Sequence, residues 1–144
     1  MFKGAYATYE SKIDSLSTPY SINETIQVID LNSTHVQIQT NSLIATSFAP
    51  TLSDQTILWV NKTNVNFQPE GMTLARTYNT KITVRSIGSR DCIVYDYTNQ
   101  EINATYYIDK VLLWPVRIVF TTVFENQTYP IEFNLKDTNI KQLN

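Results

Sequence analysis

The sequence predicts an all-β fold, or a mainly β fold with one short helix, of about eight or nine antiparallel strands. Three observations predict it. Val, Ile, Thr, Tyr, Phe and Trp dominate the apolar segments, and these side chains fit a pleated sheet better than a helix. Apolar and polar residues alternate along many segments, and turn-forming residues recur about every dozen residues. Because strands and helices do not alternate regularly, we expect a single-domain antiparallel sandwich, a barrel or a strongly curved sheet.

The predicted strands span residues 5–13, 24–32, 35–47, 55–62, 75–86, 91–99, 104–114, 116–126 and 128–137. The first is followed by DSLSTPYS, in which Pro19 and the serines favour a turn. The second and third are predicted to form a hairpin, because only Ser33 and Thr34 separate them. In the third strand Val36 and Ile38 alternate with glutamines, so we expect one buried face and one solvated face.

The middle of the chain contains a strong turn signal at Pro69-Glu70-Gly71, ahead of the fifth predicted strand. In that strand Ile82 and Val84 alternate with polar neighbours, as in a strand with one buried face. The segment EGMTLARTY, residues 70–78, is the only one that could form a short helix. The segment GSRD, residues 88–91, is predicted to be a hairpin turn.

The stretch NATYYIDKVLLWPVRIVFTTVFENQT, residues 103–128, has an apolar centre but is not predicted to cross a membrane. A spanning helix needs about 20 mostly apolar residues, and charged residues, threonines and Pro115 interrupt this run. Pro115 lacks an amide hydrogen and restricts Trp114 to extended conformations, so a helix would break there. We expect a buried pair of strands that meets near these two residues, which set a bend.

The charge pattern excludes one class of partner. Of the 144 residues 17% are charged, and the net charge is −2, whereas soluble domains usually contain about 25% charged residues. Lysines and arginines are isolated along the chain, but nucleic-acid binding needs them clustered on one face to neutralise phosphates. We therefore predict no nucleic-acid partner. Solubility is expected to depend on neutral polar residues.

Five Asn-x-Ser/Thr sequons predict an exported glycoprotein. Each has a middle residue other than proline, as the acceptor signal requires, and composition alone would give roughly two or three. The alternative is that the sequons are a by-product of a composition rich in Asn and Thr. All of them are expected at strand ends or turns, where a glycan projects into solvent. The predicted glycosylation sites are Asn23, Asn32, Asn61, Asn103 and Asn126.

The amino-terminal segment MFKGAYATYESK contains neither a long apolar stretch nor a small-residue cleavage site, so it is not a signal peptide. Either the chain is cytosolic or a leader has been removed ahead of Met1, and we expect the second. A membrane tether is expected to lie outside residues 1–144, beyond Asn144. Residues 1–144 are thus interpreted as one β-rich extracellular or cell-surface domain.

No catalytic, metal or cofactor site is predicted. The three glycines stand alone, and one histidine and one cysteine cannot make a usual zinc site. Cys92 has apolar neighbours and is predicted to be a buried small hydrophobe, with a catalytic pairing to His35 as the alternative. We therefore expect no enzyme. Carboxylate pairs for glycoside hydrolysis could be drawn, as in many β-rich proteins, from Asp91, Asp96, Glu101 and Asp109.

Aromatic side chains are the best candidates for a binding site. Exposed rings can stack on sugars or line an apolar pocket. The alternative, and the commoner outcome, is that such rings pack in the core or on the faces of the sheet. The candidates for ligand binding are Trp59, Tyr95, Tyr97, Tyr106, Tyr107 and Trp114.

Three segments, GAYATYE, NATYYIDKVLLWPVRIVF and FNLKDTNI, resemble exported β-rich proteins of thermoacidophilic archaea. In those proteins an early strand of G-x-Y-x-x-Y type and a late YYD strand recur. The resemblance implies an acidic habitat, in which carboxylates near their pKa of about 4 are largely protonated while Thr, Asn and Ser stay polar. Some of these proteins are similar in pattern to lipid carriers with a curved sheet. This chain lacks the long helices of such carriers, so lipid carriage is not predicted.

Two functions remain open from the sequence. The favoured one is a noncatalytic secreted or cell-surface domain that binds a ligand or protein partner through its aromatic residues. The alternative is a structural subunit of a surface layer, filament or virion that assembles through sheet edges such as residues 128–137. The first is expected to be monomeric with an apolar or aromatic-lined cavity, and the second to be a homo-oligomer.

Overall fold

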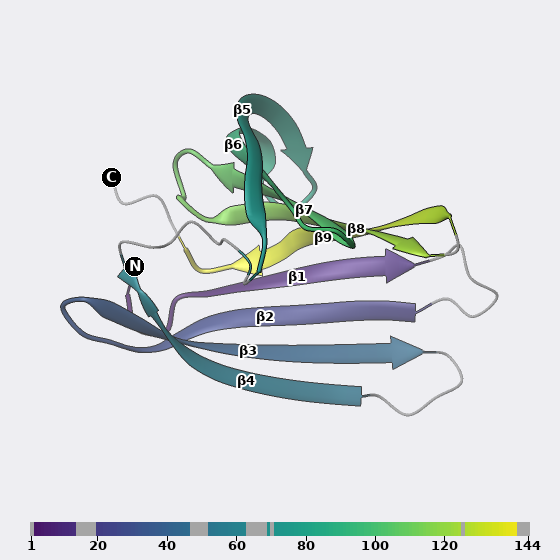
Figure 1. The fold of residues 1–144 in the computed structure, drawn as a ribbon. Coiled ribbons are helices and arrows are strands. Elements are labelled where there is room, and N and C mark those ends of the chain that lie inside the picture. Colours follow the sequence, from purple (N-terminus) through teal and green to yellow (C-terminus); the bar gives the residue numbers. More distant parts are fainter. Residues whose placement is uncertain are drawn as a thin grey trace. The chain divides into compact units, whose positions relative to one another are not determined.

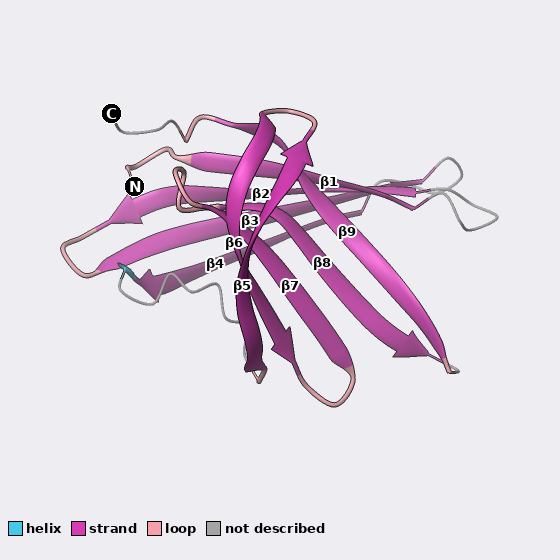
Figure 2. Ribbon diagram, turned by 90° about the horizontal axis from the view of Figure 1, so that it is seen from above, coloured by secondary structure: helices cyan, strands magenta, loops and turns pink. Residues whose placement is uncertain are grey.

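The computed structural model describes residues 2–13, 20–46, 52–62, 69, 71–124 and 126–140. Within these ranges the chain forms nine strands and no α-helix, and therefore no helix that could span a membrane. Figure 2 shows the strands in magenta. The strands are β1 (Tyr6–Ile13), β2 (Tyr20–Leu31), β3 (His35–Thr46), β4 (Leu52–Asn61), β5 (Thr73–Val84), β6 (Gly88–Thr98), β7 (Ile102–Asp109), β8 (Pro115–Phe124) and β9 (Gln127–Thr138) (Figure 1).

All nine strands belong to one antiparallel sheet, in the hydrogen-bonding order β4-β3-β2-β1-β9-β8-β7-β6-β5. The sheet is open, because β4 and β5 each have a strand neighbour on one side only. The all-β prediction is confirmed, and of the architectures expected the sandwich and the closed barrel are wrong. The sheet edge expected at residues 128–137 is also wrong, because β9 lies between β1 and β8.

The nine predicted strands occur in the predicted order, but some boundaries differ. The alternative with a short helix at residues 70–78 is wrong for the described residues 71–78: β5 begins at Thr73, and its ladder with β6 outweighs the local helix preference. The turn expected at residues 88–91 is also wrong, because these residues begin β6. Gly88 adopts a φ of +80° at that point, a backbone conformation that glycine tolerates best.

The chain divides into two compact units. Unit 1 contains residues 1–65 and 136–141, and unit 2 contains residues 66–135 and 142–144. Strand β9 therefore belongs to both: its last residues, from Lys136, are part of unit 1, and the rest is part of unit 2.

Unit 1 is an antiparallel meander of β1 to β4. The strands pair in sequence order, β1 with β2, β2 with β3 and β3 with β4, and Figure 1 shows them side by side. The predicted hairpin of β2 and β3 is confirmed. Its turn is fixed by the side chain of Asn32, whose Oδ1 accepts hydrogen bonds from the N–H groups of Thr34 (2.9 Å) and His35 (2.8 Å). One cluster of the core consists of Ala5, Val28 and Val36, with Leu31, Ile38 and Ile140 packed against them.

The C-terminal segment of unit 1 is hydrogen-bonded to β1. The side chain of Asn139 accepts a bond from the Tyr6 N–H (2.8 Å) and donates one to the Gly4 carbonyl (2.9 Å). The Thr138 hydroxyl donates to the Tyr6 carbonyl at 2.6 Å, and Lys136 forms an ion pair with Glu10. These contacts join the first and last strands of the chain.

Unit 2 contains β5 to β8 and most of β9, which form an antiparallel sheet that curls on itself. The Ser86 hydroxyl, in the turn after β5, donates to the Leu135 carbonyl of β9 at 2.6 Å. The Arg117 guanidinium on β8 donates to the Thr83 carbonyl of β5 at 3.1 Å. Two strands lie between β5 and β8 in the sheet order, and three lie between β5 and β9, so these contacts require that the end of β5 bends back over this sheet.

The turn between β7 and β8 differs from the predicted strand pair. Strand β7 ends at Asp109 rather than at Trp114, and a tight turn separates it from β8. The Asp109 carboxylate accepts hydrogen bonds from the N–H groups of Val111 (2.8 Å) and Leu112 (2.7 Å). Leu113 adopts a φ of +54°, which is unfavourable for a residue with a Cβ. Trp114 and Pro115 are buried, as predicted, and Pro115 begins β8.

Candidate functional site

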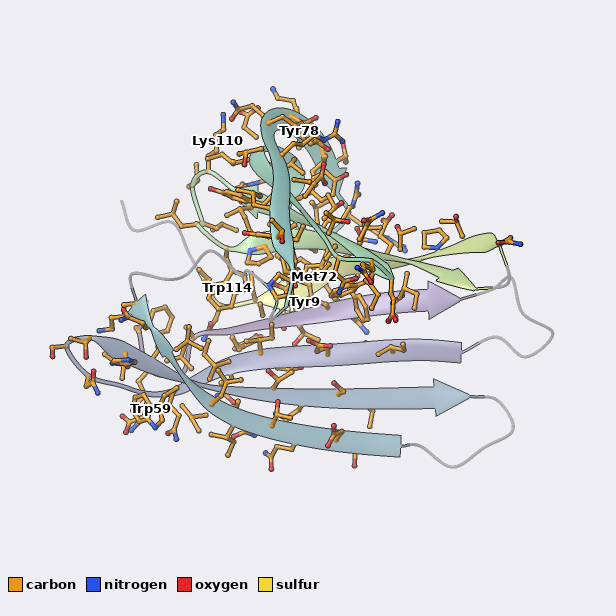
Figure 3. All side chains as sticks on the ribbon, viewed as in Figure 1. Tyr9, Trp59, Met72, Tyr78, Lys110 and Trp114 are labelled. Atoms are coloured by element: carbon orange, nitrogen blue, oxygen red, sulfur yellow. The ribbon has the colours of Figure 1, made fainter. Side chains whose placement is uncertain are left out.

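The structure separates the six aromatic candidates into three groups. Tyr97, Tyr106 and Trp114 are buried in unit 2, and Tyr95 and Tyr107 are half-buried in the same unit. Trp59 is exposed, on β4 of unit 1 (Figure 3). Five of the six rings therefore lie in one unit, and Trp59 in the other.

Aromatic rings on one face of unit 2 pack against each other. Tyr97 on β6, Tyr106 on β7, Phe120 on β8 and Phe133 on β9 form an edge-to-face row, with centroid distances of 5.8, 6.3 and 6.2 Å between successive rings. Edge-to-face pairs at these distances contribute about 0.5–1.5 kcal/mol each beyond area burial. Tyr95 stacks on Tyr97 at 6.4 Å. Three of the six candidate rings, Tyr95, Tyr97 and Tyr106, therefore have a packing role.

The opposite face of unit 2 carries paired charges. The Arg76 guanidinium lies 4.6 Å from the centroid of the Tyr78 ring and donates to Asp96 at 2.5 Å. Asp96 also accepts a hydrogen bond from the Thr105 hydroxyl at 2.7 Å. Both oxygens of this carboxylate thus have donors, an arrangement that favours a structural role. On β8, the Arg117 guanidinium lies 5.7 Å from the centroid of the Tyr107 ring on β7.

The most buried carboxylate of unit 2 is paired as well. Asp109 is 1% exposed and receives two hydrogen bonds from Arg90, one of them from Nη2 at 3.0 Å. Burial by itself raises the pKa of Asp109, but the bonds from Arg90, Leu112 and Val111 outweigh it, so the pKa is lowered. The carboxylate is therefore ionised and fixed, unlike the protonated acid that glycoside hydrolysis needs.

Cys92 is buried, as predicted. The pKa of its thiol is raised to about 11, mainly by burial and also by the neighbouring carboxylate of Asp109, while Arg90 acts in the opposite direction. A nucleophilic cysteine needs its thiolate at working pH, which requires a lowered pKa. The thiol of Cys92 is thus suited to packing.

The clearest exposed apolar feature is on β4, the end strand of unit 1. Ile57, Leu58 and Trp59 are 53%, 50% and 48% exposed. Because successive side chains of a strand point to opposite faces, Leu58 lies on one face and its two neighbours on the other. Both faces of the strand therefore present large apolar groups to solvent.

The backbone of β4 can be assigned to its two edges. The Lys62 N–H donates to the Thr34 carbonyl at 2.9 Å, on the side of β3. Alternate residues of a strand direct their N–H and C=O groups to opposite edges, so the even-numbered residues face β3. The Gln55 N–H is consistent with this assignment, because it donates to the Asp54 side chain (2.9 Å) and not to β3. Ile57 and Trp59 therefore direct their backbone groups outward, where the described part of the chain has no strand.

The two edges of the sheet differ in protection. Natural proteins protect edges with bulges and charges, and β5 has both: a bulge between Leu74 and Arg76, and the cations Arg76 and Lys81. The Thr83 carbonyl of β5 is also bonded to Arg117. Strand β4 has an uninterrupted register with β3, and residues 55–60 contain no charge and no proline. This edge is open to pairing.

The β4 site was missed from the sequence except for Trp59. The signal was the run ILW at residues 57–59, in which consecutive large apolar residues place apolar groups on both faces of a strand. A central buried strand has the same pattern, so the sequence alone does not distinguish the two.

The sequons lie at strand ends or turns except for one. Asn32, Asn103 and Asn126 are exposed, and Asn61 is the last residue of β4. The expectation is wrong for Asn23, which lies inside β2 and has a buried side-chain oxygen. Glycosylation itself stays a prediction.

A scan against protein-family models and a search of curated proteins give no match to this sequence. Among solved structures, the chain is similar to a domain from Vibrio parahaemolyticus described as that of an outer membrane lipoprotein-sorting protein. The sequences are 11% identical, the match covers 98% of this chain and 86% of that chain, and the TM-score is 0.31. A TM-score this low carries no argument about function.

Proposed function

We propose that the chain is a noncatalytic, exported binding domain that pairs with an extended protein segment along β4. The observation that carries the proposal is the open edge of this strand, where Ile57, Leu58 and Trp59 flank outward-directed backbone groups. In strand addition, main-chain hydrogen bonds supply affinity and alternate side chains supply specificity. Trp59 is then the anchor, since tryptophan is enriched among residues that dominate binding energy.

The chemistry of unit 2 supports a noncatalytic role. The carboxylates Asp96 and Asp109 are bonded to Arg76 and Arg90, and the raised pKa of Cys92 removes a nucleophile. A catalytic acid or base needs a pKa near the working pH and access to substrate. These side chains have the hydrogen-bonding pattern of structural ion pairs.

The extracellular part of the proposal depends on the five sequons. Asn103 and Asn126 are exposed, which is the condition for a glycan to project into solvent. The alternative function, a subunit of a surface layer, filament or virion, needs two adhesive edges for continued assembly. Since β5 has a bulge and two cations, it is a poor second edge.

The test is hydrogen–deuterium exchange of the full chain with an extended probe peptide of alternating valine and threonine, with a lysine at each end. We expect the amides of Ile57 and Trp59 to exchange more slowly when the peptide is present. The matched variant is Ile57→Pro, which removes an outward N–H and leaves the donors that face β3. With the chain dilute enough to be monomeric, equal protection in this variant, or no protection by the peptide at either amide, would refute strand addition at β4.

A further inference from the structure

We infer that the segment which pairs with β4 is β4 of a second copy of this chain, antiparallel and with its two-fold axis at Leu58. The inference rests on the proposed function, because it names the partner of the same edge. In this register Ile57 of one copy lies opposite Trp59 of the other. Asp54 of one copy lies opposite Lys62 of the other.

The backbone fits this register. Ile57 and Trp59 both direct their N–H and C=O groups outward, as the Lys62 and Gln55 hydrogen bonds indicate. Two outward residues opposite each other form a hydrogen-bonded pair, in which each N–H donates to the other's carbonyl. Leu58 then forms a non-hydrogen-bonded pair with itself at the axis. Shifting the partner by one residue would set outward groups opposite inward groups.

The side chains fit it on both faces of the strand. On one face Leu58 meets Leu58 of the second copy, and Thr56 meets Val60. On the other face the pair of Ile57 and Trp59 occurs twice, and pairs of an aromatic with a β-branched residue are favourable across strands. The pairing thus covers the apolar groups that β4 exposes on either side.

The charges select this register over those shifted by two residues, which the backbone would also allow. Residues 52–62 contain two charged side chains, Asp54 and Lys62, near opposite ends. Centred on Leu58, each carboxylate faces an ammonium group on the same face of the sheet. A shift by two residues would place Asp54 opposite Val60, or Lys62 opposite Thr56. Lys62 also donates to the Asn32 carbonyl of its own chain, which leaves it further hydrogens, since an ammonium has three.

The first test is oxidative crosslinking of two cysteine variants of the full chain. In Leu58→Cys the new thiols meet at the axis, with Cα atoms about 4.5 Å apart, which a disulfide can bridge. In the matched control Thr56→Cys the corresponding atoms are about 14 Å apart, because four residues of strand separate them. The buried Cys92 is common to both. We expect a covalent dimer on non-reducing gels for Leu58→Cys only.

The second test is the dimer dissociation constant from sedimentation equilibrium at low salt. Asp54→Lys creates two like-charge contacts per dimer, and we expect dissociation to become easier by about tenfold. The same holds for Lys62→Asp. The double variant Asp54→Lys/Lys62→Asp exchanges the charges and should restore the constant to within about twofold of wild type. Failure to restore it would overturn this register.

The outcomes separate this inference from the proposed function. A wild-type chain that stays monomeric, while the valine–threonine peptide still protects Ile57 and Trp59, would overturn self-pairing and leave the β4 site intact. A dimer that crosslinks equally well through Thr56→Cys would overturn the register. A monomer with no protection at these amides would overturn both.

Discussion

The substitution Asp109→Ala tests whether one buried carboxylate holds the β7–β8 turn. It removes the acceptor for two turn N–H groups, those of Val111 and Leu112, and for two bonds from Arg90. It also leaves the Arg90 guanidinium without its anion. Asp91, one strand away and 67% exposed beside Lys81, provides the matched control Asp91→Ala.

The expected loss of stability in Asp109→Ala follows from the burial of this carboxylate. Removing one partner of a buried ion pair typically costs about 3–5 kcal/mol. Asp109 is 1% exposed, but the Arg90 side chain is 25% exposed, so water can solvate part of the charge left behind. We therefore expect a loss of about 3 kcal/mol in the free energy of unfolding, or roughly 10 °C in melting temperature. Asp91→Ala should cost less than about 0.5 kcal/mol.

Urea unfolding followed by tryptophan fluorescence measures the difference. In a Trp59→Phe background the signal comes from Trp114, which is buried directly after the turn. The loss from one ordinary hydrogen bond is about 1 kcal/mol. If the free energies of unfolding of Asp109→Ala and Asp91→Ala differ by less than about this amount, the assignment of the turn's stability to this ion pair is wrong.

The pH dependence of the unfolding free energy independently checks the direction of the Asp109 pKa shift. The pKa of Asp109 is lowered from its ordinary value of 3.8, so the folded state binds this proton less readily than the unfolded state does. The stabilisation is fully present above the unfolded pKa and is lost as the pH falls through the lower folded pKa. The gap in unfolding free energy between wild type and Asp109→Ala should therefore narrow below pH 3.8 and stay constant at higher pH.

Three further predictions concern single side chains. At pH 8 the Cys92 thiol should react with iodoacetamide at least about 100-fold more slowly in the folded chain than in urea, measured by mass spectrometry, because a pKa of about 11 leaves roughly one thiolate in a thousand. Burial raises the pKa of Glu24, so Glu24→Gln should unfold at slightly higher urea than wild type at pH 7 and at the same urea at pH 3; a gain that persists at pH 3 would contradict this. In a glycosylating host Asn103 should carry glycan and Asn23 should not, as glycopeptide mass spectrometry would show, because Asn23 has a buried oxygen inside β2.

The strands were predictable because their signal is local. The hairpin of β2 and β3 was predicted from residues that lie within a few positions of each other, and it is confirmed. The end of β7 was not predictable in this way. Lys110 to Trp114 is apolar enough to continue a strand, but the Asp109 carboxylate captures two N–H groups of the turn. Its position is fixed by Arg90, a partner 19 residues away.

The candidate site was predictable only in part, because exposure depends on strand order. Trp59 was identified as a candidate, but Ile57 and Leu58 were not, since the same run suits a strand covered on both sides. Residues 128–137 were interpreted as an edge, with alternating apolar and polar residues, but they belong to the central strand β9. Which strands are neighbours is decided by pairing between residues more than 100 positions apart, as between Tyr6 and Asn139.

The attachment of β1 to the end of β9 has a consequence for biosynthesis. Each meander, β1 to β4 and β5 to β9, pairs strands that follow one another in the chain, and such local contacts form early and fast. The other neighbour of β1 is β9, whose end is synthesised much later, since 132 positions separate Tyr6 from Thr138. Until then β1 is a bare edge in a nascent polypeptide, a state prone to wrong association. A chain truncated before Lys136 would keep most of its strands and leave β1 with one permanently adhesive border.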